Sequence, residues 1–329
     1  MFGLFGGSKK SELKPKNWHP DMEVALEHMR NGNWSALSQL LAKQSNNSRF
    51  ALIQSCGVNG DLGEFHMQFP QTSDADVFVG GVRTQWAWRY RGGATADHVG
   101  HDAAILFLKE LKAATVHLDR ALATQPDNSL AQGFKIRIAM GLNNRAECDA
   151  LIARLIQCDD PPMEGLGAAL QALCPKWGGS LEQLFAFARD VAQRQNIHAA
   201  RYALLARAHI ETWLDALMDD DASVRADYQN YLTRDDVKRE IIEANSVFNV
   251  EMTENLSFQN DSFAAQFAHN NFGYALYRAG QKELAATHIE ALKDNPSETP
   301  WAYSFGDSIS SKWAKLRKQV GLPKEISQA

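Results

Sequence analysis

Cysteine, proline and β-branched runs are all scarce in this chain of 329 residues. The four cysteines, Cys56, Cys148, Cys158 and Cys174, are scattered and show no Cys-x-x-Cys spacing. That distribution argues against a disulfide framework and suits a reducing cytoplasm. The 10 prolines lie mostly at the ends of expected helices, and alternating β-branched runs are nearly absent, so we expect little or no sheet.

Net charge and long apolar segments are also lacking. The formal net charge is only −5, whereas a nucleic-acid surface needs a concentrated basic face, so we expect no nucleic-acid partner. We interpret the basic cluster Lys9, Lys10, Lys14 and Lys16 as part of a solvated, flexible N-terminal tail, residues 1–16. The apolar start, MFGLFGG, is too short to span a bilayer, which leaves disorder or a weak amphipathic tether. We expect no transmembrane segment.

What the sequence does contain is a pattern typical of paired helices, clearest in residues 271–296. Small residues, Gly273 and Gly280, stand where two helices approach and where the chain turns. An apolar stripe then predicts the inner face of a second helix that ends before Pro296: Ala285, Ile289 and Leu292. The offsets resemble those of a tetratricopeptide unit of about 34 residues, one residue short at its end. Such a unit cannot bury its apolar face alone and must stack on neighbours.

Further copies of this pattern occur upstream. Residues 111–126 carry small and apolar residues at the offsets of a second repeat helix, and the same phase continues through residues 129–160, where Cys148, Ile152 and Leu155 take the inner positions. A weaker copy near the N-terminus places Gly32 at the turn. We therefore predict an all-α protein, a tetratricopeptide-like α-solenoid of stacked helical hairpins with degenerate repeats. It would form a single helical-repeat domain over residues 17–329, with the clearest repeats at 104–161 and 262–296.

A second strong signature, ALCPKWGGSLEQLFAFARDVA, covers residues 172–192. Pro175 closes one helix, Gly178-Gly179 permits a sharp reversal, and Ser180 with Gln183 forms a capping box for the next helix. Lys176 and Trp177 are left over. Trp177 is expected to pack over the turn, and Lys176 either belongs to this turn or helps to hold an anion at the helix N-terminus.

The segment KWGGS (residues 176–180), the aromatic helix after it, and AHIE (residues 208–211) resemble a bacterial family of uncharacterised proteins. WAWRYRG (residues 86–92) is similar to the same pattern, so the resemblance covers about residues 86–213. It implies a helical fold like that of tetratricopeptide proteins. It implies no activity, because the family has none established that could be transferred to these residues.

A metal site is one alternative for DHxxHD, residues 97–102. On a helix, His98 and His101 would be neighbours, and Asp97 and Asp102 would give four ligands or two carboxylate-oriented histidines. The structural alternative is a helix start, where aspartates stabilise the dipole and Gly100 loosens the backbone. No Gly-x-x-x-x-Gly-Lys-Ser/Thr loop and no Gly-x-Ser-x-Gly elbow is present, and we expect no cofactor.

Residues 57–93 form the segment that fits the repeat pattern least. Irregular segments in a repeat array are often where function is located, and tryptophan and arginine dominate interface hot spots. We therefore predict a partner-binding surface at Trp86, Trp88, Arg89 and Arg91, facing the pair Lys176 and Trp177. The alternative is that both tryptophans are buried and the arginines pair locally.

Together these patterns predict a non-catalytic helical scaffold that binds a protein or peptide partner in a bacterial cytoplasm. Adaptor, secretion-associated chaperone and antidote to a toxic partner are the roles that this fold suggests by analogy. Two alternatives remain open. One is a metal-dependent or anion-binding helical enzyme centred on His98 and His101, and the other is a self-assembling structural protein. The sequence does not define the oligomeric state.

Overall fold

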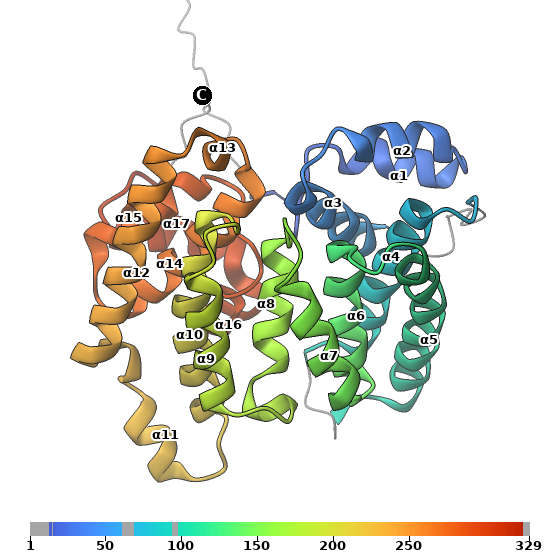
Figure 1. Ribbon diagram of the computed structural model, residues 1–329. Helices are drawn as coiled ribbons and strands as arrows, with labels where there is room; N and C mark the ends of the chain where they lie inside the picture. Colours follow the sequence, from blue (N-terminus) through green and yellow to red (C-terminus); the bar gives the residue numbers. More distant parts are fainter. Residues whose placement is uncertain (1–12, 15, 61–68, 94–97, 325–329) are drawn as a thin grey trace, which may run out of the picture.

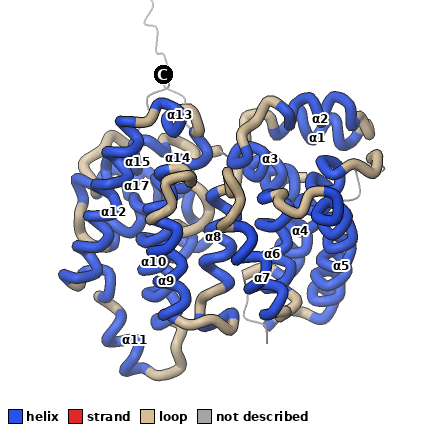
Figure 2. The backbone as a smooth tube through the Cα atoms, in the orientation of Figure 1, coloured by secondary structure: helices blue, strands red, loops and turns tan. Residues whose placement is uncertain are grey.

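The computed structural model describes residues 13–14, 16–60, 69–93 and 98–324. All regular structure in these residues is helical, as the sequence predicts (Figure 2). The helices pack in neighbouring pairs and form two groups, with one helix between them (Figure 1).

The first group contains seven α-helices. In chain order they are α1 (Met22–Arg30), α2 (Trp34–Ala42), α3 (Asn46–Asn59), α4 (Ser73–Arg91), α5 (His101–Thr124), α6 (Ser129–Gly141) and α7 (Arg145–Leu155). One hydrophobic cluster, from Met22 to Ile138, fills this half from α1 to α6, while the buried residues of α7 belong to the cluster of the second half. Within it the rings of Phe50 and Phe134 stack with their centroids 4.0 Å apart, which joins α3 to α6.

The second group follows α8 (Met163–Ala172), which lies between the two halves (Figure 1). A larger hydrophobic cluster, from Ile136 to Val320, fills it. Its longer helices are α9 (Leu181–Ala192), α10 (Ala203–Leu217), α12 (Asp235–Glu254), α14 (Ser262–Arg278), α15 (Lys282–Leu292) and α17 (Ile309–Gln319). Short helices connect them: η3 (Pro175–Trp177), η4 (Ala199–Tyr202), α11 (Ala222–Tyr228), η5 (Tyr231–Thr233), α13 (Leu256–Gln259), α16 (Ala302–Phe305) and η6 (Gly306–Ser308).

The predicted helical hairpins are present. Gly280 has a φ of +77° at the turn between α14 and α15, and Gly32 has a φ of +62° between α1 and α2, a backbone conformation that glycine adopts without strain. The predicted inner positions of α15 and α7 are buried: Ala285, Ile289, Leu292, Cys148, Ile152 and Leu155. The pairing of helices is therefore confirmed, whereas their stacking as a tetratricopeptide-like solenoid stays a prediction.

Two glycines bring α6 and α8 into direct contact. A Cβ atom built at Gly133 would lie 3.1 Å from the Cα atom of Gly165 and 3.0 Å from the Phe50 ring. The close approach places the next turns of both helices side by side. The two hydrophobic clusters also meet at α6, since Ile136 belongs to one and Ile138 to the other.

Two expectations about irregular segments were wrong. Much of the segment 57–93 is the regular helix α4, which begins at Ser73 and ends at Arg91, while residues 61–68 lie outside the described residues. The end of the predicted flexible tail is held to the second half of the chain. Lys14 donates its backbone N–H to the Asp294 carbonyl at 2.9 Å, and the Lys16 ammonium contacts Glu298 at 2.6 Å. Lys9 and Lys10 lie outside the described residues.

Candidate functional site

The predicted aromatic–arginine surface assembles around Trp88, at the end of α4. The ring of Trp88 meets that of Trp177 from η3 edge to face, with centroids 5.8 Å apart. The Arg91 guanidinium lies 5.5 Å from the centroid of each ring. Gly178, with a φ of +82°, makes the turn that presents Trp177. The structure therefore brings Trp88, Arg91 and Trp177 together, as the sequence predicts.

Two of the other predicted surface residues have structural contacts instead. Trp86 is only 2% exposed and belongs to the hydrophobic cluster of the first half. Arg89 donates to the carbonyl oxygens of Gly57 and Gly60, at 3.2 and 2.7 Å, and so caps the C-terminal end of α3. The structural alternative was right for Trp86, while Trp88 and Arg91 remain half-exposed.

Lys176 belongs to a buried ion network. Its ammonium lies 2.9 Å from the Glu211 carboxylate on α10, whose side chain is 0% exposed. The Arg207 guanidinium lies 2.7 Å from the same carboxylate, and the Tyr303 hydroxyl donates to it at 2.9 Å. Burial alone would raise the pKa of the Glu211 carboxyl. The positive charges of Arg207 and Lys176 lower that pKa by more than burial raises it, so it lies below its ordinary value. Lys176 and Arg207 thus share the single negative charge of Glu211.

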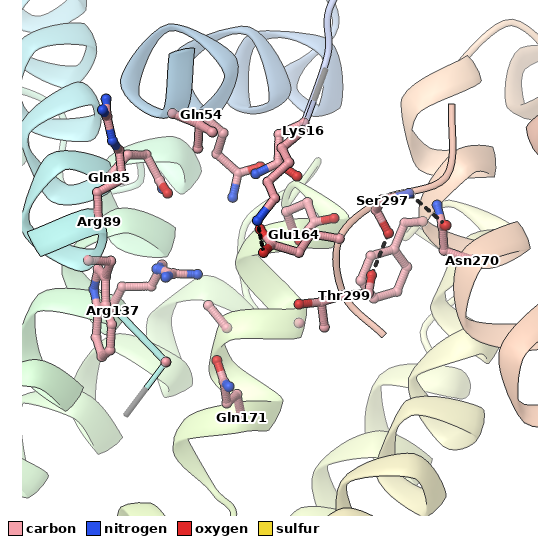
Figure 3. A pocket seen from close by; sticks show the side chains of 18 of the residues that line it. Lys16, Gln54, Gln85, Arg89, Arg137, Glu164, Gln171, Asn270, Ser297 and Thr299 are labelled. Atoms are coloured by element: carbon pink, nitrogen blue, oxygen red, sulfur yellow. Dashed lines mark hydrogen bonds and ion pairs between the residues drawn. The ribbon is translucent and has the colours of Figure 1, made fainter. Parts of the chain in front are cut away.

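A pocket of about 640 Å³ opens between the two halves, next to this cluster (Figure 3). Six helices supply its walls: Gln54 and Val58 from α3, Gln85, Trp88 and Arg89 from α4, Arg137 from α6, Glu164, Gly167, Ala168 and Gln171 from α8, Arg207 from α10, and Phe267, Asn270 and Asn271 from α14. Lys16, Asn17, Gly92, Gly93 and residues 297–299 complete the rim. Most of these side chains are polar, although they come from helices that otherwise pack in the core.

Arg137 is the basic side chain at the centre of this site. Its guanidinium lies 5.1 Å from the centroid of the Trp88 ring, and its Nε is buried. Within the described residues, no hydrogen bond or ion pair to Arg137 is found. Burial lowers the pKa of this guanidinium. Arg137 is half-buried, and a partly desolvated cation without an ion pair is unfavourable, so its position favours an anionic ligand.

Glu164 lies one helix away on α8 and faces the same pocket. It is exposed, and the surface that it exposes lines the cavity. Burial by the surrounding protein raises the pKa of its carboxyl, against the influence of Arg207 and Arg137. In the described part of the chain it has no ion pair closer than 4.0 Å. The pocket therefore offers a negative group beside the positive one.

Carboxamides surround these two charges. Gln85 is 5% exposed, and its Nε2 has no acceptor within the described residues. Gly57 makes room for it, since a Cβ atom there would lie 2.4 Å from the Gln85 Cβ. The sequence analysis missed this residue together with Arg137, Glu164, Gln54 and Gln171. The sequence signal for such residues is polar side chains among the apolar residues of a buried helix, as Arg137 is in LAQGFKIRIAMG.

The three described members of the predicted metal group, His98, His101 and Asp102, are not arranged to hold a metal ion. His98 precedes α5, and His101 is its first residue, so the two do not share a helix face as predicted. Asp97 lies outside the described residues, and Asp102 is exposed in the first turn. Across the described ranges, no group of three or more His, Cys, Asp and Glu residues is arranged to hold a metal ion.

Comparison with protein-family models, with curated proteins and with solved structures finds no match. The resemblance based on residues 176–180 accordingly stays a prediction. Among the described helices, none combines the length and the apolar character needed to cross a membrane.

Proposed function

We propose that this chain is a non-catalytic helical scaffold that binds a protein or peptide partner in a bacterial cytoplasm, as an adaptor, a chaperone or an antidote. The observation that carries the proposal is the pocket between the two halves of the molecule, with the Trp88, Arg91 and Trp177 cluster against its wall. Trp88 belongs to both features. A partner segment that enters the pocket would therefore contact the aromatic–arginine cluster as well.

Energetic considerations support this choice of surface. Tryptophan and arginine supply most of the binding energy in many interfaces, and they do so where water is excluded around them. The Trp88 and Trp177 indole nitrogens are buried, and neither has an acceptor among the described residues. Polar side chains line the pocket, and a partner segment that enters it can form hydrogen bonds with them.

The proposal is tested by capture from a bacterial lysate with a tagged chain. The Trp88→Ala and Trp177→Ala variants are compared with Trp34→Ala, which removes a half-buried tryptophan of α2 that does not line the pocket. We expect a stoichiometric partner that both pocket variants lose by at least tenfold and the control retains, with unchanged helicity by circular dichroism. A chain that captures nothing, or a partner that all three variants retain equally, would contradict the proposal.

Two further functions have no specific observation in their favour. Lys176, which the sequence made a candidate anion ligand, pairs with Glu211, and His98 and His101 do not share a helix face.

Self-assembly is checked by light scattering of the purified chain over a range of concentrations. A mass that rises with concentration would favour a structural assembly over a monomeric scaffold.

A further inference from the structure

We propose that the pocket recognises a carboxylate through Arg137 and, on the same ligand, a hydrogen-bond-donating or cationic group through Glu164. The inference rests on the proposed function where the ligand is a segment of a partner, and it names the chemistry of that segment. An acidic side chain followed by backbone N–H groups has this chemistry, and so does a free amino acid.

The first step is the state of Arg137. A guanidinium presents five N–H donors in a planar fork that matches the two oxygens of a carboxylate. The Arg137 guanidinium lies 5.1 Å from the centroid of the Trp88 ring, at the wall of the pocket. Its Nε is buried and has no acceptor within the described residues. Arg137 is thus half-buried at the pocket without an ion pair in that part of the chain, which distinguishes it from Arg207, whose guanidinium pairs with Glu211.

The second step is a count of charges around the pocket. Six charged side chains line it: Lys16, Arg89, Arg137, Arg207, Glu164 and Glu298. Lys16 contacts Glu298, and Arg207 contacts Glu211. Of the rest, Arg89 bonds to backbone carbonyls, and no ion pair of Arg137 or Glu164 is found in the described residues. These three sum to +1, from two positive charges and one negative charge. This excess favours an anionic group at Arg137, and an ammonium group on the same ligand can pair with Glu164.

The third step is the placement of Glu164. The contact between Gly133 and Gly165 brings α6 and α8 together, so that Arg137 and Glu164 stand on neighbouring helices and face one cavity. Figure 3 shows both side chains at the same cavity, together with Gln54, Gln85 and Gln171. A carboxylate oxygen accepts only, so Glu164 selects N–H groups or ammonium groups on the ligand. The carboxamides both donate and accept, which suits amide groups between the two ends.

The experiment measures binding directly with small probes. Arginine-labelled protein (¹⁵N) is titrated with ω-amino acids from glycine to 6-aminohexanoate, with propionate, with inorganic phosphate, and with the capped peptide acetyl-Ala-Ala-Glu-Ala-Ala-amide. The side-chain Nε–H signal of Arg137 is assigned by its loss in Arg137→Gln. We expect that signal to shift with at least one ω-amino acid or with the glutamate peptide, but not with the matching glutamine peptide.

Two variants and a control separate the roles of the charges. Arg137→Gln should lower the affinity for the best probe at least tenfold. Glu164→Gln should lower it at least fivefold for the ω-amino acid or peptide and leave propionate binding unchanged or tighter. The control Arg189→Gln, an exposed arginine outside the pocket, should leave the affinities unchanged. Phosphate binding alone, or equal affinities in Arg137→Gln and wild type, would overturn the inference.

These outcomes are distinct from those of the capture experiment. A partner that needs Trp88 and Trp177 but not Arg137 or Glu164 would refute the carboxylate assignment and leave the scaffold function intact. Free ω-amino acids that bind tightly in the absence of any partner would retain the assignment and refute the protein-binding function. The glutamate peptide alone would support both.

Discussion

The Glu211 network offers the sharpest test of how the second half of the molecule is held together. Its carboxylate accepts from groups on three elements, because Lys176 lies in η3, Arg207 in α10 itself and Tyr303 in α16. Replacing Glu211 with glutamine keeps the shape of the side chain and removes the negative charge. The two cations then lose their counterion, and at least one hydrogen bond has the wrong donor–acceptor polarity.

The expected cost follows from burial. Removing one partner of a buried ion pair typically costs about 3–5 kcal/mol, because the other charge is left uncompensated. The Lys176 side chain is 28% exposed, so its ammonium can turn toward solvent, whereas the Arg207 side chain is 10% exposed and cannot. The uncompensated charge of Lys176 should therefore cost little stability, whereas that of Arg207 should cost most of the expected amount. We expect Glu211→Gln to lower the free energy of unfolding by about 3 kcal/mol.

Urea unfolding, followed by circular dichroism at pH 7, measures this difference. The matched control is Asp190→Asn, which removes a carboxylate paired with Arg194 one helical turn away on α9, where the Asp190 side chain is 52% exposed. An exposed pair of this kind contributes about 0.3–0.5 kcal/mol. A Glu211→Gln protein within 1 kcal/mol of wild type, with an unchanged dependence on urea, would refute the reasoning. Adding Lys176→Met to Glu211→Gln should restore little, since Arg207 carries the larger share.

Three further predictions concern stability and reactivity. Burial lowers the pKa of His19 to about 4 and of His288 to about 3, so both are neutral when folded and gain protons on unfolding below pH 6.5. The contribution of each histidine to the free energy of unfolding is therefore complete near pH 7.5 and falls by about 2 kcal/mol by pH 5. In urea titrations, His288→Gln should reduce this dependence on pH. An unchanged dependence would show that His288 is not held neutral in the folded chain. Gly179→Ala would place a Cβ atom 2.0 Å from a backbone carbonyl oxygen, so we expect thermal unfolding to show a loss of about 3 kcal/mol in the free energy of unfolding. The control Gly100→Ala meets no described atom within 4 Å and should lose less than about 1 kcal/mol. Equal losses in the two variants would contradict this reasoning. Burial raises the pKa of Cys174 to about 12, so at pH 8 an aromatic disulfide reagent should label it at least 100-fold more slowly in the folded than in the urea-unfolded chain, and similar rates would show that the thiol is accessible.

Local signals explain why the hairpins were predictable. A turn such as that at Gly280 is specified by one glycine and by the apolar stripe beside it, and both lie within a few residues in sequence. The reversal at Gly178 and the cap at Ser180, whose hydroxyl accepts from the Gln183 N–H at 3.1 Å, are equally local. The meeting of Trp88 with Trp177 was anticipated from residue type alone, without a distance.

The helix α4 was missed for a physical reason. Its residues are buried on nearly every face between Ala75 and Ala87, so the sequence shows no amphipathic period. The same burial hides Trp86 and leaves Arg89 to cap a neighbouring helix. Hydrophobic periodicity identifies a helix that has one solvent-exposed face, and α4 has little exposed surface before its last turn.

The pocket could not be predicted because its residues are remote in sequence. Arg137 and Glu164 become neighbours only through the glycine contact between two helices. On its own helix, each is one of two or more polar residues among apolar ones, with nothing to single it out. Whether Arg137 and Glu164 line the same pocket depends on how the two halves pack. No single window of the sequence contains that information.

The spread of the pocket walls along the chain has a consequence for protein synthesis. The walls begin at Lys16 and end at Thr299, and those supplied by α14 and residues 297–299 emerge last from the ribosome. At a translation rate of about 5–20 residues per second, these walls are synthesised several seconds after the helices that carry Arg137 and Glu164. A nascent or prematurely terminated chain has the charged residues but no closed cavity. Ligand binding at the complete pocket would therefore require translation past residue 299.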